Sequence, residues 1–136
     1  MAVEMRLVRI VISEISDGQF VYLREVDGTR EFAMVIGLFE ASRIDMRVRN
    51  ERPPRPLTHD LISNIVEALG AELDSVIISE LKEGTYFAKL RLKRDGEIID
   101  VDSRPSDAIA TAVCVDPPLP IFVEEDVIEE SMQQPE

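Results

Sequence analysis

Tryptophan is absent from this chain of 136 residues, and aromatic side chains make up only 5% of it. The core must therefore consist mainly of Val, Ile, Leu and Ala. The shortage of aromatic rings also leaves few platforms on which unpaired nucleic-acid bases could stack. With 45% hydrophobic residues at this length, we expect one domain with a core of its own.

Cysteine and long apolar segments are equally scarce. Cys114 is the one cysteine, so no internal disulfide can form, and its apolar neighbours predict a buried thiol in a reducing compartment. No run approaches the roughly 20 apolar residues that span a membrane. Charged residues interrupt the first segment, MAVEMRLVRIVIS, as they would not in a secretory signal. We expect a cytoplasmic protein with no membrane partner.

Positive charge is in deficit, because 27 acidic residues face 15 basic ones and the formal net charge is −12. Residues 126–136 contain no base and are predicted to be an acidic C-terminal tail or a brief helix. Five arginines lie within residues 43–55, where they indicate either a solvated helix face or a local basic patch. An acidic protein repels polyanions on average, so nucleic-acid binding would have to use such a patch.

Several common functional motifs are missing as well. The patterns GxxxxGK[ST], GxGxxG, CxxC, HExxH and GxSxG do not occur. Their absence removes most nucleotide-binding and zinc-binding classes of protein.

The sequence does contain an internal repeat, with half-repeats at about residues 5–49 and 73–114. The matching positions are Gly18 with Gly84, Phe20 with Tyr86, Leu23-Arg24 with Leu90-Arg91, Asp27-Gly28 with Asp95-Gly96, and Glu40-Ala41 with Asp107-Ala108. Each half reads as three antiparallel strands and a helix, because β-branched or alternating runs are separated by turn residues. The Asp-Gly pairs are typical of two-residue hairpin turns.

A central helix is predicted over residues 58–70, with Thr58 as its N-cap and Gly70 as its end. Its apolar residues fall on one face. The predicted fold class is therefore α+β, with one domain over residues 1–125. Its mixed, mostly antiparallel sheet would be built from a duplicated β-β-β-α unit with the central helix as the link.

Two helix starts share one polar pattern, RPLTHD at 55–60 and RPSD at 104–107. Each combines an arginine, hydroxyl groups and a carboxylate with the unpaired N–H groups of a helix start, which attract anions. Ordinary helix capping is an alternative explanation for Thr58, Ser103, Ser106 and Asp107. Both interpretations stay open.

His59 and a group of carboxylates are the remaining candidates for chemistry. His59 is the only histidine and could exchange a proton near neutral pH, although a surface residue beside a helix start is the plainer interpretation. The spacing of Asp100, Asp102 and Asp107 would allow them to bind Mg²⁺ or Mn²⁺, which prefer oxygen ligands. Acidic residues at strand ends are common, so this spacing is a weak signal.

These motifs resemble the bifunctional nuclease domain family. The matching segments are VIGLFEA (35–41), RPLTHDLISNIVEALGAE (55–72), GTYFAKLRL (84–92) and DSRPSDAIATA (102–112). With the strands between them they cover residues ~7 to ~125, and the RPLTHDL and RPSDAIA segments are the specific ones. Departures are small, since Leu38 stands where the family usually has Pro and Ser103 where it usually has Ala.

The resemblance implies an oligomeric α+β domain, with members described as nucleases acting on RNA and DNA. It places the shared polar positions of the family on Glu40, Thr58, His59, Asp60, Arg104, Ser106 and Asp107. From these residues we predict a nuclease that hydrolyses phosphodiester bonds in RNA and DNA. The predicted catalytic residues are Glu40, His59, Asp60 and Asp107, the predicted substrate-binding residues are Arg55, Thr58, Arg104 and Ser106, and the predicted Mg²⁺ or Mn²⁺ ligands are Asp102 and Asp107, joined by Glu40.

A non-enzymatic function is the alternative. The net charge of −12 and the shortage of aromatic residues favour an oligomeric module that binds a protein partner or a small anionic ligand. The Arg-Pro motifs would then hold the two half-repeats together. In either case we expect a homo-oligomer, most simply a dimer.

Overall fold

The structure is a computed structural model that describes residues 1–13 and 18–133. Residues 14–17, within the first predicted half-repeat, and residues 134–136, at the end of the predicted acidic tail, lie outside the described part. The elements follow in the order β1 (Ala2–Ile12), β2 (Gln19–Glu25), β3 (Glu31–Ile36), α1 (Leu38–Val48), α2 (Thr58–Ala68), β4 (Glu72–Lys82), β5 (Thr85–Arg94), β6 (Glu97–Ser103), α3 (Pro105–Cys114), β7 (Ile121–Glu124) and α4 (Glu125–Gln133).

The strands form one sheet in the order β3-β2-β1-β7-β4-β5-β6. Neighbouring strands are antiparallel except β4 and β7, which run parallel. The predicted α+β class with a mixed, mostly antiparallel sheet is therefore confirmed. Each predicted half has the element order β-β-β-α, and β7 lies between the two groups of strands. That this order arose by duplication stays a prediction.

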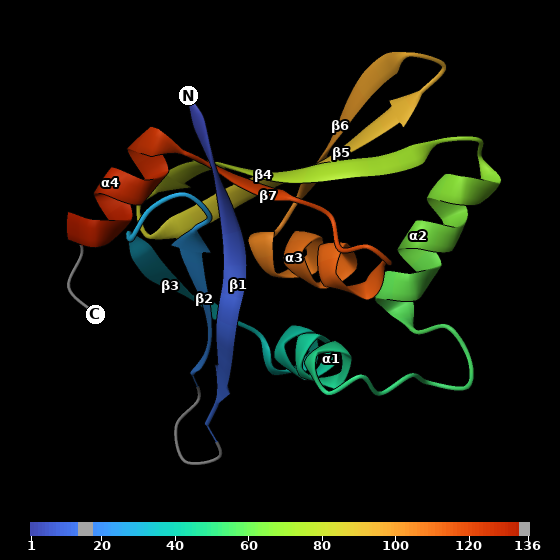
Figure 1. Ribbon diagram of the computed structural model, residues 1–136, viewed down its shortest axis with the longest axis horizontal. Helices are drawn as coiled ribbons and strands as arrows, with labels where there is room; N and C mark the ends of the chain where they lie inside the picture. The colour runs from blue at the N-terminus through green and yellow to red at the C-terminus, as the bar shows by residue number, and fades with distance from the viewer. Residues whose placement is uncertain (14–17, 134–136) are drawn as a thin grey trace.

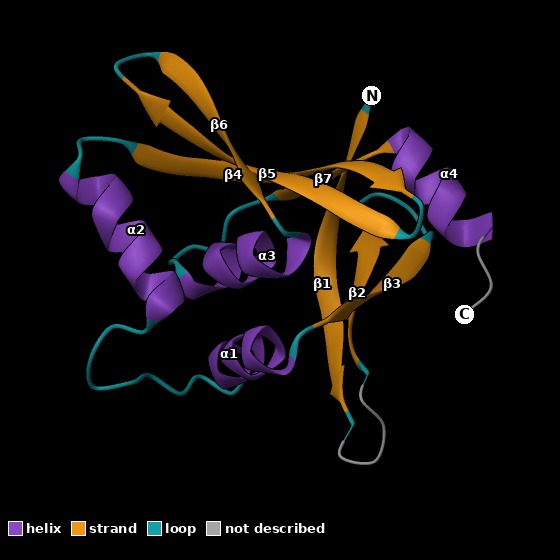
Figure 2. Ribbon diagram, turned by 180° about the vertical axis from the view of Figure 1, so that it is seen from behind, coloured by secondary structure: helices purple, strands orange, loops and turns teal. Residues whose placement is uncertain are grey.

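Helix α3 occupies the centre of the molecule, beside α1 and against the sheet (Figures 1 and 2). Seven of its ten residues are buried, among them Ala108, Ala110 and Ala112, whose small side chains allow close packing. Cys114 at its end is half-buried, and burial raises the pKa of its thiol. No helix in the described part of the chain has the length and apolar character needed to cross a membrane.

The two Asp-Gly turns have different outcomes. Asp95 and Gly96 join β5 to β6 with φ angles of 50° and 80°, as a two-residue turn requires. The same prediction for Asp27 and Gly28 is wrong, because residues 26–30 form a longer loop between β2 and β3. The Glu25 carboxylate closes this loop by accepting hydrogen bonds from the Arg30 backbone N–H at 3.0 Å and from Arg30 Nε at 2.8 Å.

The predicted central helix is present as α2, with two differences. Leu57 is the N-cap in place of Thr58, which is the first helical residue, and Gly70 follows the helix with a φ of 78°. The predicted apolar face packs only in part. Ile62 contacts the core, whereas exposed side chains continue the face along the helix at Leu61, Ile65 and Leu69.

The segment predicted as an acidic tail is largely part of the fold. Helix α4 places Val127 and Ile128 in the hydrophobic core and leaves the acids at 126, 129 and 130 exposed. Tyr86 Oη lies 2.8 Å from Ser131 Oγ, so the helix is also fastened to β5. Apolar residues that recur at helical spacing among the acids thus bring this segment into the core, while the domain boundary at residue 125 stays a prediction.

Truncation of Ile128 tests this packing. Ile128 is fully buried, so we expect Ile128→Ala to lower the free energy of unfolding by about 2–5 kcal/mol, measured by urea denaturation. Met132→Ala on the exposed side of α4 is the control and should change it by less than about 0.5 kcal/mol. Equal effects of the two substitutions would contradict the assignment of α4 to the core.

Candidate functional site

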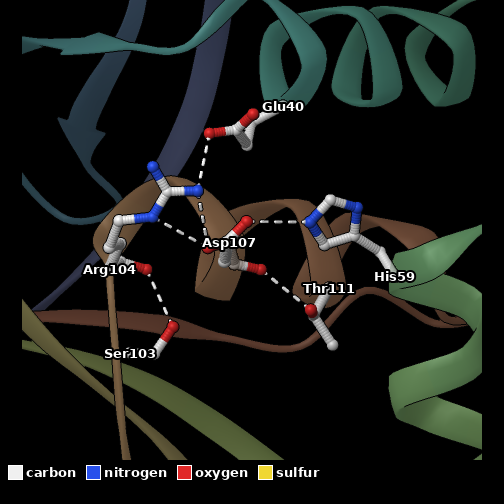
Figure 3. A network of polar contacts seen from close by, with 6 residues as sticks. All are labelled: Glu40, His59, Ser103, Arg104, Asp107 and Thr111. Atoms are coloured by element: carbon white, nitrogen blue, oxygen red, sulfur yellow. Dashed lines mark hydrogen bonds and ion pairs between the residues drawn. The ribbon is translucent and has the colours of Figure 1, made fainter.

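The first turns of α1, α2 and α3 meet at one polar network (Figure 3). Arg104 Nη2 donates to Glu40 Oε1 at 2.8 Å, and Arg104 Nε donates to Asp107 Oδ2 at 3.0 Å. The other oxygen of Asp107, Oδ1, lies 3.1 Å from His59 Nε2. Residues from three helices, far apart in the sequence, therefore form one continuous chain of contacts.

Local backbone conformation places Arg104 and Glu40. Arg104 precedes Pro105, which favours the extended conformation that it adopts, with φ −69° and ψ 144°. Gly37 is the N-cap of α1, and a Cβ there would lie 2.8 Å from Glu40 Oε1. A side chain at residue 37 would therefore displace the carboxylate from its contact with Arg104.

Three carboxylates hold the same position in their helices. Glu40, Asp60 and Asp107 are each the third residue, where a carboxylate can accept a hydrogen bond from the N-cap N–H. Asp60 does so, since its Oδ2 accepts from Leu57 N at 2.9 Å. Glu40 and Asp107 instead accept from Arg104. The third-position carboxylate therefore caps the helix in α2, whereas in α1 and α3 it binds Arg104 within the polar network.

Burial is unequal across the network. Glu40 and His59 are only 8% and 9% exposed, whereas the Arg104 side chain is 67% exposed. Hydrogen bonds to Asp107, and then its charge and that of Glu40, raise the pKa of the Arg104 guanidinium, so it stays positive at all relevant pH values. The network therefore presents an accessible positive charge in front of a buried carboxylate and a buried imidazole.

The hydrogen bond to Asp107 decides which nitrogen of His59 is reactive. An ionised carboxylate only accepts hydrogen bonds, so His59 Nε2 carries the proton. In neutral His59 the lone pair is then on Nδ1, which has no hydrogen-bond partner within the described residues. This is the arrangement in which an aspartate orients a histidine that accepts a proton.

The other predicted site residues lie at several places. Asp60 binds Arg43 Nη2 through Oδ1 at 2.6 Å and belongs to the structural support of α2. Arg55 and Thr58 line a groove next to His59. Ser106 is buried in the first turn of α3 and caps no helix. Ser103 donates to the Arg104 carbonyl oxygen at 2.8 Å, so its predicted capping role is wrong.

The predicted metal ligands are not gathered into a ready site. Within residues 1–13 and 18–133, no three His, Cys, Asp or Glu side chains are grouped so that they could hold a metal ion. Asp100 is paired with Arg91, whose hydrogen bonds lower the pKa of the Asp100 carboxyl, and Asp102 is exposed on β6. Binding of Mg²⁺ or Mn²⁺ stays a prediction.

The structure adds three residues that the sequence motifs did not indicate. Arg43 is buried and pairs with Asp60, while Phe39 and Asn64 line the groove beside His59. Arg43 belongs to an arginine-rich segment, and the composition of that segment does not show which of its arginines is buried. One feature of the sequence could have indicated Phe39, because it is an aromatic residue directly before Glu40 in the motif VIGLFEA.

The fold and site define an α+β domain in which an aspartate-bound histidine lies beside an exposed guanidinium. The chain belongs to the bifunctional nuclease domain family, whose model matches residues 21–136. An uncharacterized protein of Mycobacterium tuberculosis strain H37Rv is 42% identical over 125 residues, which are 92% of this chain and 73% of that protein.

Plant proteins named as nucleases are more distant relatives. Bifunctional nuclease 1 of Arabidopsis thaliana is 32% identical over 97 residues, which are 68% of this chain and 30% of that protein. Bifunctional nuclease 2 of Oryza sativa subsp. japonica is 33% identical over the same number of residues. The plant proteins are thus much longer than the segment that they share with this chain.

The structural role of Asp60 is open to a direct test. Asp60→Asn removes the charge from the contacts with Arg43 and Leu57 N, so we expect the free energy of unfolding to fall by about 1–3 kcal/mol. Urea denaturation measures this change. Glu67→Gln, at an exposed acid on the same helix, should have almost no effect. An unchanged midpoint in the Asp60 variant would mean that this carboxylate does not support α2.

Proposed function

We propose that this protein hydrolyses phosphodiester bonds in RNA and DNA. The observation that carries the proposal is the contact between His59 Nε2 and Asp107 Oδ1, next to the exposed guanidinium of Arg104. Membership of the bifunctional nuclease domain family and similarity to plant proteins named Bifunctional nuclease support it.

In the proposed mechanism His59 acts as the general base. Its Nδ1 takes a proton from a water molecule, the water oxygen forms a bond to phosphorus, and the bond to the leaving sugar oxygen breaks. Asp107 holds the imidazole in the required tautomer and stabilises the imidazolium that forms. The leaving oxygen takes up a proton from solvent, and the His59 imidazolium releases its proton to solvent. Water as the nucleophile serves DNA and RNA alike, because no 2′-hydroxyl is needed.

Charge at the site determines how a phosphate is bound. Glu40, Asp107 and Arg104 together carry −1, so these three groups do not attract an anion by themselves. Arg55, in the groove beside His59, supplies a second cation for the proposed phosphate contact with Arg104. A divalent cation would supply further positive charge, which is why Mg²⁺ or Mn²⁺ remains part of the proposal.

Cleavage of single-stranded RNA and DNA by purified protein is the decisive measurement. We expect cleavage, and a rate that is higher with Mg²⁺ or Mn²⁺ than with EDTA would support the metal-assisted form of the proposal. His59→Ala and Asp107→Asn should each lower the rate by about 10²–10⁴-fold, because proton transfer is lost. The matched control is Asp74→Asn, at a paired aspartate on β4 outside the network. Activity that persists in both site variants would refute the mechanism.

A non-enzymatic assembly role is the second candidate, and the apolar face of α2 favours it. Ile65 and Leu69 are exposed at the C-terminal half of the helix, away from the first turn that holds His59. We propose that copies of the chain associate through this half of α2. The contact would leave the polar network accessible.

Sedimentation velocity tests this association. Ile65→Asp places a charge on the proposed contact, so we expect the oligomer to dissociate to monomers while the fold is retained. Val35→Asp, at an exposed position on β3, is the control and should leave the oligomer intact. A wild-type chain that sediments as a monomer would refute the proposal.

A further inference from the structure

A groove of about 750 Å³ lies directly beside His59. The first turn of α1, the connecting residues before α2 and the first half of α2 form its walls. The residues important for its chemistry are Phe39, Arg55, Leu57, His59, Leu61 and Asn64. The imidazole of the proposed active site therefore belongs to a larger surface depression, of which the hydrolytic mechanism uses only His59 and Arg55.

Phe39 is the most unusual residue of this groove. It is 85% exposed, in a chain where aromatic residues are few. Packing into the core does not account for the ring, because the buried side of α1 is formed by other residues such as Ala41 and Ile44. Leu57 and Leu61 are also exposed, so an apolar platform with one aromatic ring lies open next to the polar network.

The charge of the groove is opposite to that of the protein. Arg43 and Arg55 line it, and no aspartate or glutamate among the described residues does so, although the formal net charge is −12. Arg55 has no ion-pair partner in the described part of the chain, and the buried Nε of Arg43 has no hydrogen-bond partner there. Arg43 is already paired with Asp60 through Nη2, so the groove combines one unpaired cation, Arg55, with an aromatic surface.

An aromatic platform beside arginines fits a nucleotide better than a second copy of this chain. A nucleotide brings a flat base for the ring and a negative phosphate for the guanidinium. An apolar protein surface would instead bury Arg55 without a counter-charge, which is unfavourable. In a duplex the base faces are covered by stacking, so the partner must be single-stranded.

We propose that this groove binds an unpaired nucleotide of single-stranded RNA or DNA, with the base stacked on Phe39 and its phosphate at Arg55. The strand then passes His59, so the groove determines which phosphodiester bond enters the site. Asn64 presents an amide that can donate to or accept from any base edge, so little base specificity is expected. This inference rests on the proposed function and adds a preference for single strands to it.

A tryptophan at residue 39 would report the stacking directly, because the natural chain contains none. Phe39→Trp would be titrated with a phosphorothioate-linked oligothymidylate, which resists hydrolysis. We expect saturable quenching of the tryptophan emission, and little quenching by a blunt duplex of the same length. Phe87→Trp, at an exposed position on β5, is the matched control and should show none. Unchanged emission at residue 39 while the oligonucleotide binds would overturn the proposal.

Affinity and cleavage separate this inference from the proposed function. Phe39→Ala should weaken binding of the labelled oligonucleotide by about tenfold, and Phe39→Tyr should retain it. Quenching and binding in a protein that cleaves nothing would support the groove and refute the nuclease. Cleavage that depends on Asp107 but not on Phe39 would support the nuclease and refute the binding role of the groove. If Phe39→Ala only converts an oligomer to monomers, the groove is a contact between copies and the inference is wrong.

Discussion

Burial of the Glu40 carboxylate is the constraint on which the arrangement of the helices depends. An ionised carboxylate that is 8% exposed requires a cation within hydrogen-bonding distance, because its transfer from water is otherwise very unfavourable. Arg104, 64 residues further along the chain, supplies that cation and so joins α1 to α3. The same guanidinium binds one oxygen of Asp107, which leaves the other oxygen directed at His59 and at the start of α2.

These contacts fix the side-chain positions of the proposed active site before any substrate is bound. His59 cannot turn freely, since Asp107 holds its Nε2 and Asp107 is held in turn by Arg104. Such a supported histidine is what proton transfer requires, because the position of the acceptor is set in advance. The acidic body of the protein would confine a bound polyanion to the few places where arginines face outward.

Much of the site was predictable because its residues obey local rules. Pro105 and the third-position carboxylates mark helix starts in the sequence, and three of those starts meet in the structure. Local rules do not reveal partners that are distant in sequence. No sequence feature around Asp60 indicated that Arg43 would bind it. The sequence alone therefore could not distinguish a catalytic role of Asp60 from a role in supporting α2.

The fold was predictable to a similar degree and for the same reason. Alternating strands and the Asp95-Gly96 turn follow from periodicity and backbone preference. The loop that contains Asp27 could not be predicted in this way, because its conformation depends on the hydrogen bond between Glu25 and Arg30. The burial of α4 was hidden by its many acids, since Val127 and Ile128 are only a small part of that segment.

The position of β7 between β1 and β4 has a consequence for synthesis of the chain. The first strand pairs with the last one, and the contact between Met1 and Glu124 joins residues 123 positions apart. While the ribosome is still making the second half, β1 can pair with β2 but has an open edge on its other side. The sheet closes only when β7 emerges, so the finished core forms late and through contacts of high sequence separation.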